Sequence, residues 1–380
     1  MRILSKLVVG AAVAATAVAL AAPSALADPP RGVTPRSFDV VGTGSNTIEF
    51  VWDQFSVNYN AEHKTHNATH PWIYSWDAAP TNATFVPKQG CKAITRTSVN
   101  GSSAGIAALT ADAKGARGAP CEDFARSSRA RKSTDPKLGK GGVAFVTFAR
   151  DAITYATRIT RGGSNAPKNL TTADLTKIYT CAVRNWRSFP GGKNGTIVPI
   201  LPQSSSGTRS TFLADINVTT PGSCVQSTAT LEENQGRDNI FNNANAIVPF
   251  SIGKWLTQQF RSAACINASC TVCKKPRAGQ NLFGCAVNGF LGLNSINGTP
   301  PTTGKGSKQV VNIHFTPRFF RFLYNVVRWA STPTHIPANL EAFFDSAHAR
   351  IKGWICTNAQ AKREITAYGF LNTPFCGSIS

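Results

Sequence analysis

Acidic residues are scarce in this sequence, and long apolar runs and repeats are absent from most of it. The 380 residues include 19 Asp and Glu against 40 Lys and Arg, for a formal net charge of +21 at pH 7. Beyond residue 27 no stretch is long and apolar enough for a membrane-spanning helix. The lack of a tandem repeat excludes a solenoid. The charge predicts attraction to polyanions or to an anionic cell envelope, although charge alone names no site.

The first 27 residues are typical of a cleaved export signal. Arg2 and Lys6 form a basic start, residues 7–22 are almost wholly apolar, and Ala25-Leu26-Ala27 supplies the small-x-small pattern that a signal peptidase needs. We therefore expect cleavage before Asp28 and a secreted or cell-wall-associated protein. Losing two positive charges from +21 would leave the mature chain at +19. No cysteine follows the apolar run, which excludes a lipoprotein signal, and the run is short for an uncleaved span of about 20 residues.

All ten cysteines lie beyond this segment, as expected for a protein that matures in an oxidising compartment. Proximity in the sequence suggests three disulfides, Cys91–Cys121, Cys181–Cys224 and Cys356–Cys376. The other four form a cluster: Cys265, Cys270, Cys273 and Cys285. The spacing within this cluster also resembles zinc and ferredoxin sites, but for an exported chain we favour disulfides over a metal.

The order of apolar and polar segments indicates an α/β fold. Short apolar stretches at 38–41, 93–97, 197–201 and 246–250 each run into a turn of small polar residues and then into a helical pattern. This alternation is typical of a mainly parallel sheet flanked by helices. Two further strands are expected at 143–148 and 152–157.

The C-terminal segment is expected to be one strand followed by helices. A strand is predicted at 310–315, and Pro317 would then start a helix. Its apolar residues recur every three or four positions up to Trp329, as on one face of a helix. More helix is predicted between 338 and 367.

Three turns share one design, in which glycine and small hydroxyl residues lie between a strand and a helix. They are Gly44-Ser45-Asn46-Thr47, Gly101-Ser102-Ser103 and Ser206-Gly207-Thr208. The first turn of a helix presents unpaired N–H groups and the positive end of its dipole. Several such ends that converge would bind a tetrahedral oxyanion. Arg209, just inside the third helix, would add a charge-assisted contact. The alternative for any one turn is an ordinary helix cap.

The order of these motifs resembles PstS, the phosphate-binding protein of bacterial ABC phosphate importers. The resemblance covers most of residues 38–260. It rests on Gly42-Thr43-Gly44-Ser45, Gly101-Ser102-Ser103-Ala104-Gly105-Ile106, Asp123-Phe124-Ala125-Arg126-Ser127-Ser128, Asn169-Leu170-Thr171 with Ile178-Tyr179 and Asn185-Trp186, and Ser206-Gly207-Thr208-Arg209-Ser210-Thr211-Phe212.

The resemblance implies a two-lobed type II periplasmic-binding-protein fold, each lobe a mixed, mainly parallel sheet flanked by helices. After a signal peptide at 1–27 and a lead-in at 28–37, lobe one would comprise 38–140 plus 309–380, and lobe two 141–308. The implied function is capture of inorganic phosphate or a similar oxyanion in the cleft between lobes, for ABC-type uptake. Hinge closure would follow, with no chemical step. The protein would be a monomer without metal or cofactor, and an ABC permease is its candidate partner.

The resemblance also implies which residues touch the anion. Together with their neighbours in the same turns, the expected ligand-binding residues are Ser45, Asn46, Thr47, Ser102, Ser103, Ser128, Arg129, Ser206, Gly207, Thr208 and Arg209. The family has Asp where Ser128 stands and Arg where Pro202 stands. We therefore expect Arg129 or Arg209 to supply the positive charge, and the choice between phosphate and sulfate stays open.

A secreted serine hydrolase is one alternative. Residues 101–105 also fit the G-x-S-x-G elbow with Ser103 as nucleophile, and Asp345 and His348 follow in the order of a hydrolase triad. No HGGG-type oxyanion motif accompanies them, which counts against this function.

A secreted polyanion or nucleic-acid binder is another alternative. The net charge and the scattered aromatic residues permit it. The basic residues are dispersed, however, except in the stretch 126–140, which is more typical of a solvated loop.

A metal site is conceivable where His63, His66 and His70 lie close together in the sequence. Only Glu62 accompanies them as a further ligand type, so a surface loop is the favoured interpretation.

Overall fold

The computed structural model describes residues 28–30, 32–78, 83–111, 120–160, 162–227, 231–236, 238–261, 291–332, 335–344 and 353–380. Their main sheet has nine strands in the order β2-β1-β5-β15-β6-β10-β8-β9, with β11 also pairing with β6. The strands are β1 (Val40–Gly44), β2 (Ile73–Ser75), β5 (Phe124–Ser127), β6 (Val143–Arg158), β8 (Val198–Leu201), β9 (Gln226–Ser227), β10 (Ala246–Ser251), β11 (Leu291–Leu293) and β15 (Phe320–Arg328). The pairs are parallel at both ends of this order and antiparallel in the middle, where β15 and β6 lie, which confirms the expected mixed α/β fold.

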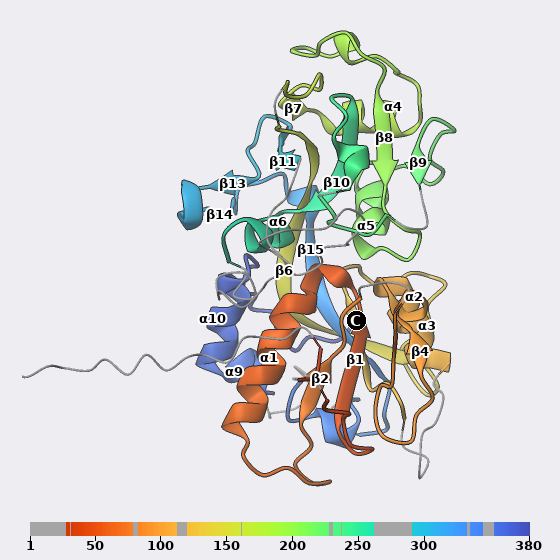
Figure 1. Cartoon of the computed structure of the whole chain (residues 1–380), viewed down its shortest axis with the longest axis vertical. Coiled ribbons are helices and arrows are strands. Elements are labelled where there is room, and N and C mark those ends of the chain that lie inside the picture. Colours follow the sequence, from red (N-terminus) through yellow and green to blue (C-terminus); the bar gives the residue numbers. More distant parts are fainter. Residues whose placement is uncertain are drawn as a thin grey trace, which may run out of the picture.

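One end of the sheet forms a lower lobe, the lower part of Figure 1, built on β2, β1, β5, β15 and the start of β6. Helices α1 (Glu49–Glu62), α9 (Trp354–Thr357) and α10 (Ala359–Ala367) lie on one side, and α2 (Arg96–Val99) and α3 (Ser102–Ala111) on the other. Its core is aromatic: the rings of Trp52 and Phe124 are 4.5 Å apart, and Phe55, Phe148 and Phe344 pack around them. Burying these large side chains supplies most of this lobe's hydrophobic stabilisation.

The other end forms an upper lobe, built on the rest of β6 with β10, β8, β9 and β11. Its helices are α4 (Thr172–Tyr179), α5 (Gly207–Asp215) and α6 (Ile252–Leu256). A separate apolar cluster fills it, with Tyr155, Tyr179, Trp186 and Phe212 fully buried. Each lobe therefore has its own core, as a domain that folds around one hydrophobic centre requires.

Within the described residues, two chain passages connect the lobes. Strand β6, expected as two strands, is continuous: its residues up to Ala152 pair with β15, and its residues from Ile153 onward pair with β10. The chain returns before β15, where Phe319 packs in the upper core and Leu323 in the lower core. Figure 1 shows β6 and β15 side by side between the lobes. The passages thus lie near Asp151 and Phe320.

The helix expected from Pro317 to Trp329 was wrong. A single 3-10 turn, η7 (Pro317–Phe319), is followed by β15. Since β15 lies between β5 and β6 and residues pointing to both of its faces are buried, its apolar residues do not alternate strictly with polar ones, and periodicity alone does not distinguish it from a buried helix. The strand expected at 310–315 shortens to β14 (Val310–Val311), which pairs with β13 (Thr302–Thr303).

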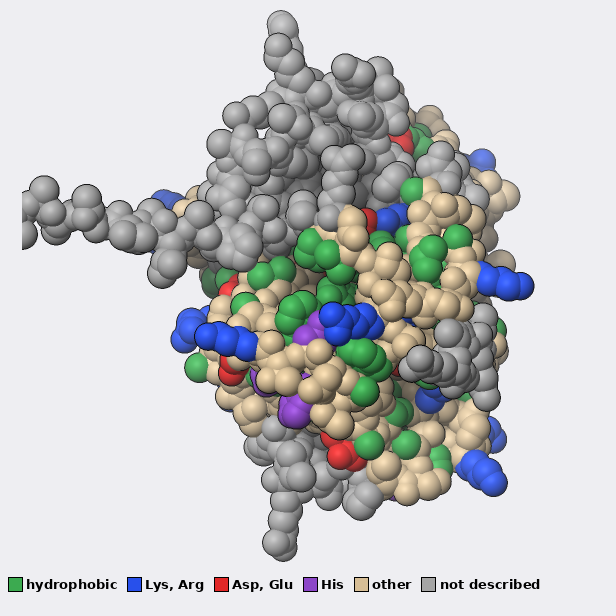
Figure 2. Space-filling view, turned by 60° about the horizontal axis from the view of Figure 1, so that its bottom comes forward, with side chains coloured by type: hydrophobic (Ala, Val, Ile, Leu, Met, Phe, Trp, Pro, Cys, Tyr) green, Lys and Arg blue, Asp and Glu red, His purple; other side chains and the backbone are tan. Residues whose placement is uncertain are grey.

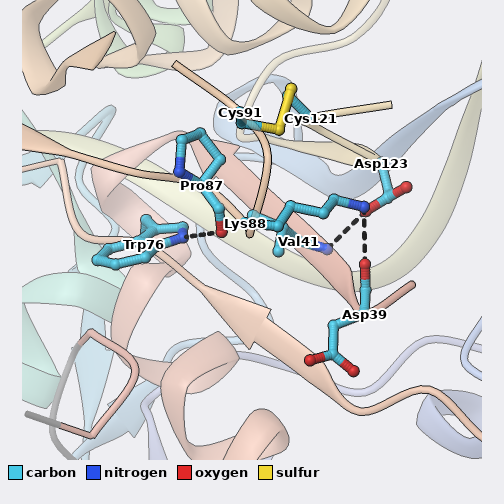
Figure 3. The surroundings of a disulfide bond; sticks show 8 residues. All are labelled: Asp39, Val41, Trp76, Pro87, Lys88, Cys91, Cys121 and Asp123. Atoms are coloured by element: carbon cyan, nitrogen blue, oxygen red, sulfur yellow. Dashed lines mark hydrogen bonds and ion pairs between the residues drawn. A yellow bond between two sulfur atoms is a disulfide. The ribbon is translucent and has the colours of Figure 1, made fainter. Parts of the chain in front are cut away.

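The three disulfides expected from proximity are confirmed: Cys91–Cys121, Cys181–Cys224 and Cys356–Cys376. Figure 3 shows the first of them beside a buried ion pair, in which Lys88 Nζ lies 2.6 Å from Asp123 Oδ2. The cluster Cys265, Cys270, Cys273 and Cys285 lies outside the described residues. Across the part of the chain that the structure covers, no helix is long and apolar enough to cross a bilayer.

Candidate functional site

The three predicted turns meet between the lobes. After β1, Gly44 turns the chain at φ +111°, where a side chain would collide with the Arg126 carbonyl. Ser45 then caps the 3-10 turn η1 (Asn46–Ile48), which leads directly into α1. After β8, Ser206 caps α5 by accepting a hydrogen bond from Arg209 N at 3.0 Å. The third turn leads into α3 at Ser102. Helix N-termini from both lobes therefore approach one point.

Six hydroxyl side chains surround that point, and we call them the hydroxyl cluster. Its members are Ser45, Thr47, Ser102 and Ser128 from the lower lobe, and Ser206 and Thr208 from the upper lobe. None is more than 1 % exposed. Ser128 N donates to Ser102 Oγ at 3.0 Å, and Thr47 Oγ1 lies 3.3 Å from Thr208 Oγ1 across the lobes. The cluster thus brings hydroxyl groups of both lobes into hydrogen-bonding contact at one buried place.

Gly207 makes this close approach possible. A Cβ atom at Gly207 would lie 2.3 Å from Ser102 Oγ and 2.4 Å from Ser128 Oγ. No side chain fits at those distances, so only glycine lets the start of α5 contact the lower lobe here.

A carboxylate that the sequence did not point to lies inside the hydroxyl cluster. Glu233 is fully buried. Its Oε1 accepts hydrogen bonds from Ser45 Oγ at 2.9 Å, Thr47 N at 3.2 Å and Thr47 Oγ1 at 3.1 Å. Its Oε2 accepts from Ser206 Oγ and from Thr208 N at 3.2 Å. The available signal was the adjacent pair Glu232-Glu233 in a chain with few acidic residues.

Arg321 from β15 supplies positive charge at the cluster. Its Nη1 donates to Ser128 O at 2.9 Å and to Thr208 Oγ1 at 3.1 Å. Its Nε and Nη2 donate to Asp151 Oδ2 at 3.1 and 2.8 Å. Both side chains are buried. The signal for Arg321 was a charged residue among the apolar residues of this segment, and assigning the segment to a helix obscured it.

Arg129 and Arg209, the expected sources of charge, bond to other partners. Arg129 forms a two-pronged ion pair with Asp135 at 2.6 and 2.9 Å and donates from Nε to Ser103 Oγ at 3.1 Å. Arg209 Nη1 donates to Pro202 O at 2.9 Å and to Ser227 Oγ. Ser103 is thereby turned to Arg129 and away from the cluster.

Asn46 lies beside the cluster and is buried. Its carbonyl accepts from Lys254 Nζ at 2.8 Å, and Lys254 also pairs with Glu49 at 3.0 Å. Asn234, next to Glu233, donates from Nδ2 to Thr47 Oγ1 at 3.1 Å. These contacts hold the first turn of the lower lobe against the upper lobe.

A second buried glutamate lies next to the cluster. Glu232 Oε2 accepts from Gln203 Nε2 at 2.8 Å, on the upper lobe, and from Asn100 Nδ2, on the lower lobe. Burial raises the pKa of Glu232 to about 8, because loss of hydration disfavours the ionised form. Adjacent glutamates therefore both bridge the two lobes.

The alternative sites receive little support from the geometry. His66 bonds to Asp39 at 2.7 Å and stacks on Trp72, while His63 stacks on Tyr59. Among the residues that the structure describes, no three His, Cys, Asp or Glu side chains gather as a metal site. Ser103 Oγ accepts a hydrogen bond from Arg129, and the other two expected triad residues, Asp345 and His348, lie outside the described residues.

Comparison with known proteins supports this arrangement of lobes. Residues 31–312 match the family model described as a PBP superfamily domain. A substrate-binding protein from Clostridium perfringens with bound phosphate is similar in structure, with TM-score 0.53 and 14% identity, covering 88% of this chain and 99% of that one. An ABC-type phosphate transport receptor from Vibrio cholerae is also similar, with TM-score 0.50 and 16% identity, covering 88% and 100%. Among curated proteins no sequence matches significantly. The chain belongs to the PBP superfamily, and its fold is that of these phosphate-binding relatives.

Proposed function

We propose that this chain is an exported solute-binding protein that captures inorganic phosphate or a similar tetrahedral oxyanion at the hydroxyl cluster. The observation that carries the proposal is the convergence of two helix N-termini, one from each lobe, on a single buried anionic group. Members of the PBP superfamily are binding proteins, so we propose binding and release without a chemical step.

The chemistry of the cluster supports an oxyanion. Main-chain N–H groups of Thr47 and Thr208 point to the same place, where the helix dipoles favour negative charge. The surrounding hydroxyl groups add short hydrogen bonds. The Arg321 guanidinium donates a hydrogen bond to Thr208 Oγ1, so its positive charge lies next to the site. A tetrahedral anion would use donors from both lobes at once, which favours the closed arrangement.

The location of the site supports capture by hinge motion. The cluster lies between lobes that are connected by β6 and by the passage before β15. Rotation about two passages would open the cluster to water, and binding would close it. As in the expectation from the sequence, a permease of the ABC type would be the receiving partner and the receptor would act as a monomer.

Titration calorimetry with sodium phosphate and sodium sulfate tests the proposal. We expect saturable phosphate binding with a dissociation constant below about 1 mM, equivalent to more than ~4 kcal/mol of binding free energy. Comparing the two anions also decides how the site behaves with Ser128 in place of a carboxylate. Absence of binding by either anion at about 10 mM would contradict the proposed function.

The positive charge supports a weaker association with wall polyanions. Figure 2 shows Lys and Arg side chains scattered over the described part of the face it presents, without forming one continuous patch. Separated cations favour diffuse, salt-sensitive attraction over a shaped polyanion site. We therefore propose retention at an anionic cell wall, and release at about 0.5 M salt would support it.

A further inference from the structure

We propose that Glu233 is an internal ligand of the hydroxyl cluster, so that an external oxyanion binds by displacing the Glu233 carboxylate. This inference rests on the proposed function, since it concerns the same site. It assigns to Glu233 the control of anion affinity, a role that is distinct from contacting the bound anion.

The hydrogen bonds of Glu233 show that the site is already filled. Five donors from four residues converge on its two oxygens: Ser45, Thr47, Ser206 and Thr208. Two of these donors are the helix N-terminal N–H groups that an oxyanion would need. An anion held by such groups is what the geometry of helix N-termini predicts, and here the anion belongs to the chain itself.

The same hydrogen bonds join the two lobes. Oε1 is held by the turn that precedes α1 in the lower lobe, and Oε2 by the first turn of α5 in the upper lobe. Charge-assisted hydrogen bonds of this kind are stronger than neutral ones. The Glu233 carboxylate therefore stabilises the closed arrangement without any external ligand.

Charge balance argues for displacement over joint occupancy. The nearby cation, Arg321, already pairs with the Asp151 carboxylate at 2.8 Å. Placing a phosphate or sulfate beside an ionised Glu233 would bring like charges together in a fully buried space, where repulsion is poorly screened. The carboxylate must leave before the anion takes its hydrogen bonds.

The neighbours of Glu233 stay anchored while its side chain moves. Glu232 is held by Asn100 and Gln203. On the other side, Asn234 Oδ1 accepts from Ser251 N at 3.0 Å and Asn234 O accepts from Gln258 Nε2 at 2.8 Å. Displacement is therefore a rotation of one side chain on a fixed segment, which requires no refolding of the site.

Replacing Glu233 by alanine tests the inference, with Glu62→Gln, at the exposed end of α1, as the control. Phosphate and sulfate are titrated calorimetrically into wild type and both variants, after circular dichroism has shown that each is folded. Removing the internal competitor should raise the affinity of Glu233→Ala for phosphate at least tenfold, and its affinity for sulfate likewise. Glu62→Gln should stay within about threefold of wild type, because it removes a carboxylate at the exposed end of α1 and leaves the hydroxyl cluster unchanged. If Glu233→Ala does not fold, Glu233→Gln replaces it, since it keeps the size and loses the charge.

The outcomes separate this inference from the proposed function. Tighter binding by the Glu233 variant than by a wild type that binds measurably supports both, whereas binding by the variant alone supports the internal ligand and contradicts the proposed function. If wild type binds measurably and the affinity of the Glu233 variant is equal or lower, the internal-ligand proposal is overturned and the proposed function is kept. Failure of all proteins to bind either anion at about 10 mM overturns both. Small-angle scattering adds an independent readout: the anion-free variant should expand relative to wild type and contract on addition of phosphate.

Discussion

Arg321 and Asp151 lie directly opposite each other in the β15–β6 ladder and form a buried ion pair of 2.8 Å. Asp151 also accepts from Ser251 Oγ at 2.7 Å and Gly253 N at 2.9 Å, at the start of α6. The same arginine donates a hydrogen bond to Thr208 Oγ1, a member of the hydroxyl cluster. The pair thus connects the passage between lobes to the site.

Substituting Asp151→Asn should therefore be strongly destabilising. It removes the negative charge that balances a buried guanidinium, and breaking such an ion pair costs about 3–5 kcal/mol of unfolding free energy. Asp238→Asn is the control, because Asp238 caps η4 (Asn239–Phe241) at the surface and Asn caps equally well. Urea denaturation measures both. A loss below about 1 kcal/mol in Asp151→Asn would show that the arginine finds other partners.

Substituting Thr208→Val should weaken phosphate binding at least tenfold while the protein stays folded. Valine keeps the shape and removes the hydroxyl that accepts from Arg321 at 3.1 Å. Thr208 Oγ1 makes no hydrogen bond to Glu233 among those found for the described residues, so the internal carboxylate keeps its own contacts. Thr180→Val, at the exposed end of α4, is the control for the same chemical change. Calorimetric affinities that are equal in both variants would place the anion elsewhere.

The sequence predicted those parts of the fold that depend on local signals. Caps and glycine turns are encoded within a few residues, so the turns at Ser45, Ser102 and Ser206 were found and their convergence was expected. Glu233 and Arg321 were missed because their partners lie far away in the chain: Glu233 reaches Ser45 over 188 residues, and Arg321 reaches Asp151 over 170.

The direction in which long side chains point was the second feature that the sequence did not predict. Arg209 is the third residue of α5, and its place in the sequence suggested a contact with the anion. In the structure its guanidinium turns back to Pro202 O. A helix position fixes where the backbone lies, while the nearest buried carbonyl decides where a long side chain points.

Stability should fall as pH rises from about 5 to about 8, in part because of Glu122. Burial is the main cause that raises the pKa of Glu122 from 4.5 to about 8, and a hydrogen bond from Thr43 partly opposes it. Between these values the unfolded chain releases a proton that the folded chain keeps, so unfolding becomes easier with rising pH. Below pH 4.5 Glu122 is protonated in both the folded and the unfolded chain, so its full contribution to stability is present.

Glu122→Gln should remove this part of the pH dependence. The amide is neutral in both states, so the variant should lose less stability than wild type over this range, by on the order of 3 kcal/mol. Glu232, with a pKa of about 8, and Asp215, with one of about 7, contribute in the same direction, so a smaller slope remains. Urea titrations at pH 5, 6, 7 and 8 measure it, with exposed Glu62→Gln as control. Parallel curves for wild type and Glu122→Gln would refute the assignment.

The disulfide Cys91–Cys121 and the Lys88–Asp123 ion pair should be energetically coupled. Both fasten the segment around residues 88–91 to the start of β5, as Figure 3 shows. Lys88 Nζ also donates to Asp39 O at 2.7 Å, and Asp123 Oδ2 also accepts from Val41 N at 2.8 Å, so the pair links this segment to β1.

A double-mutant cycle measures that coupling. With a separation of 30 residues, the disulfide should contribute about 3–4 kcal/mol to stability, lost in Cys91→Ala with Cys121→Ala. Lys88→Met should cost about 3–5 kcal/mol, because Asp123 is left buried without its cation. Once the disulfide is gone, the segment can move and expose Asp123 to water, so the second loss should be smaller by about 1 kcal/mol or more. Cys356→Ala with Cys376→Ala provides the uncoupled reference. If the free-energy loss of Lys88→Met is the same with and without the Cys91–Cys121 disulfide, as it should be with and without Cys356–Cys376, the disulfide and the ion pair act independently.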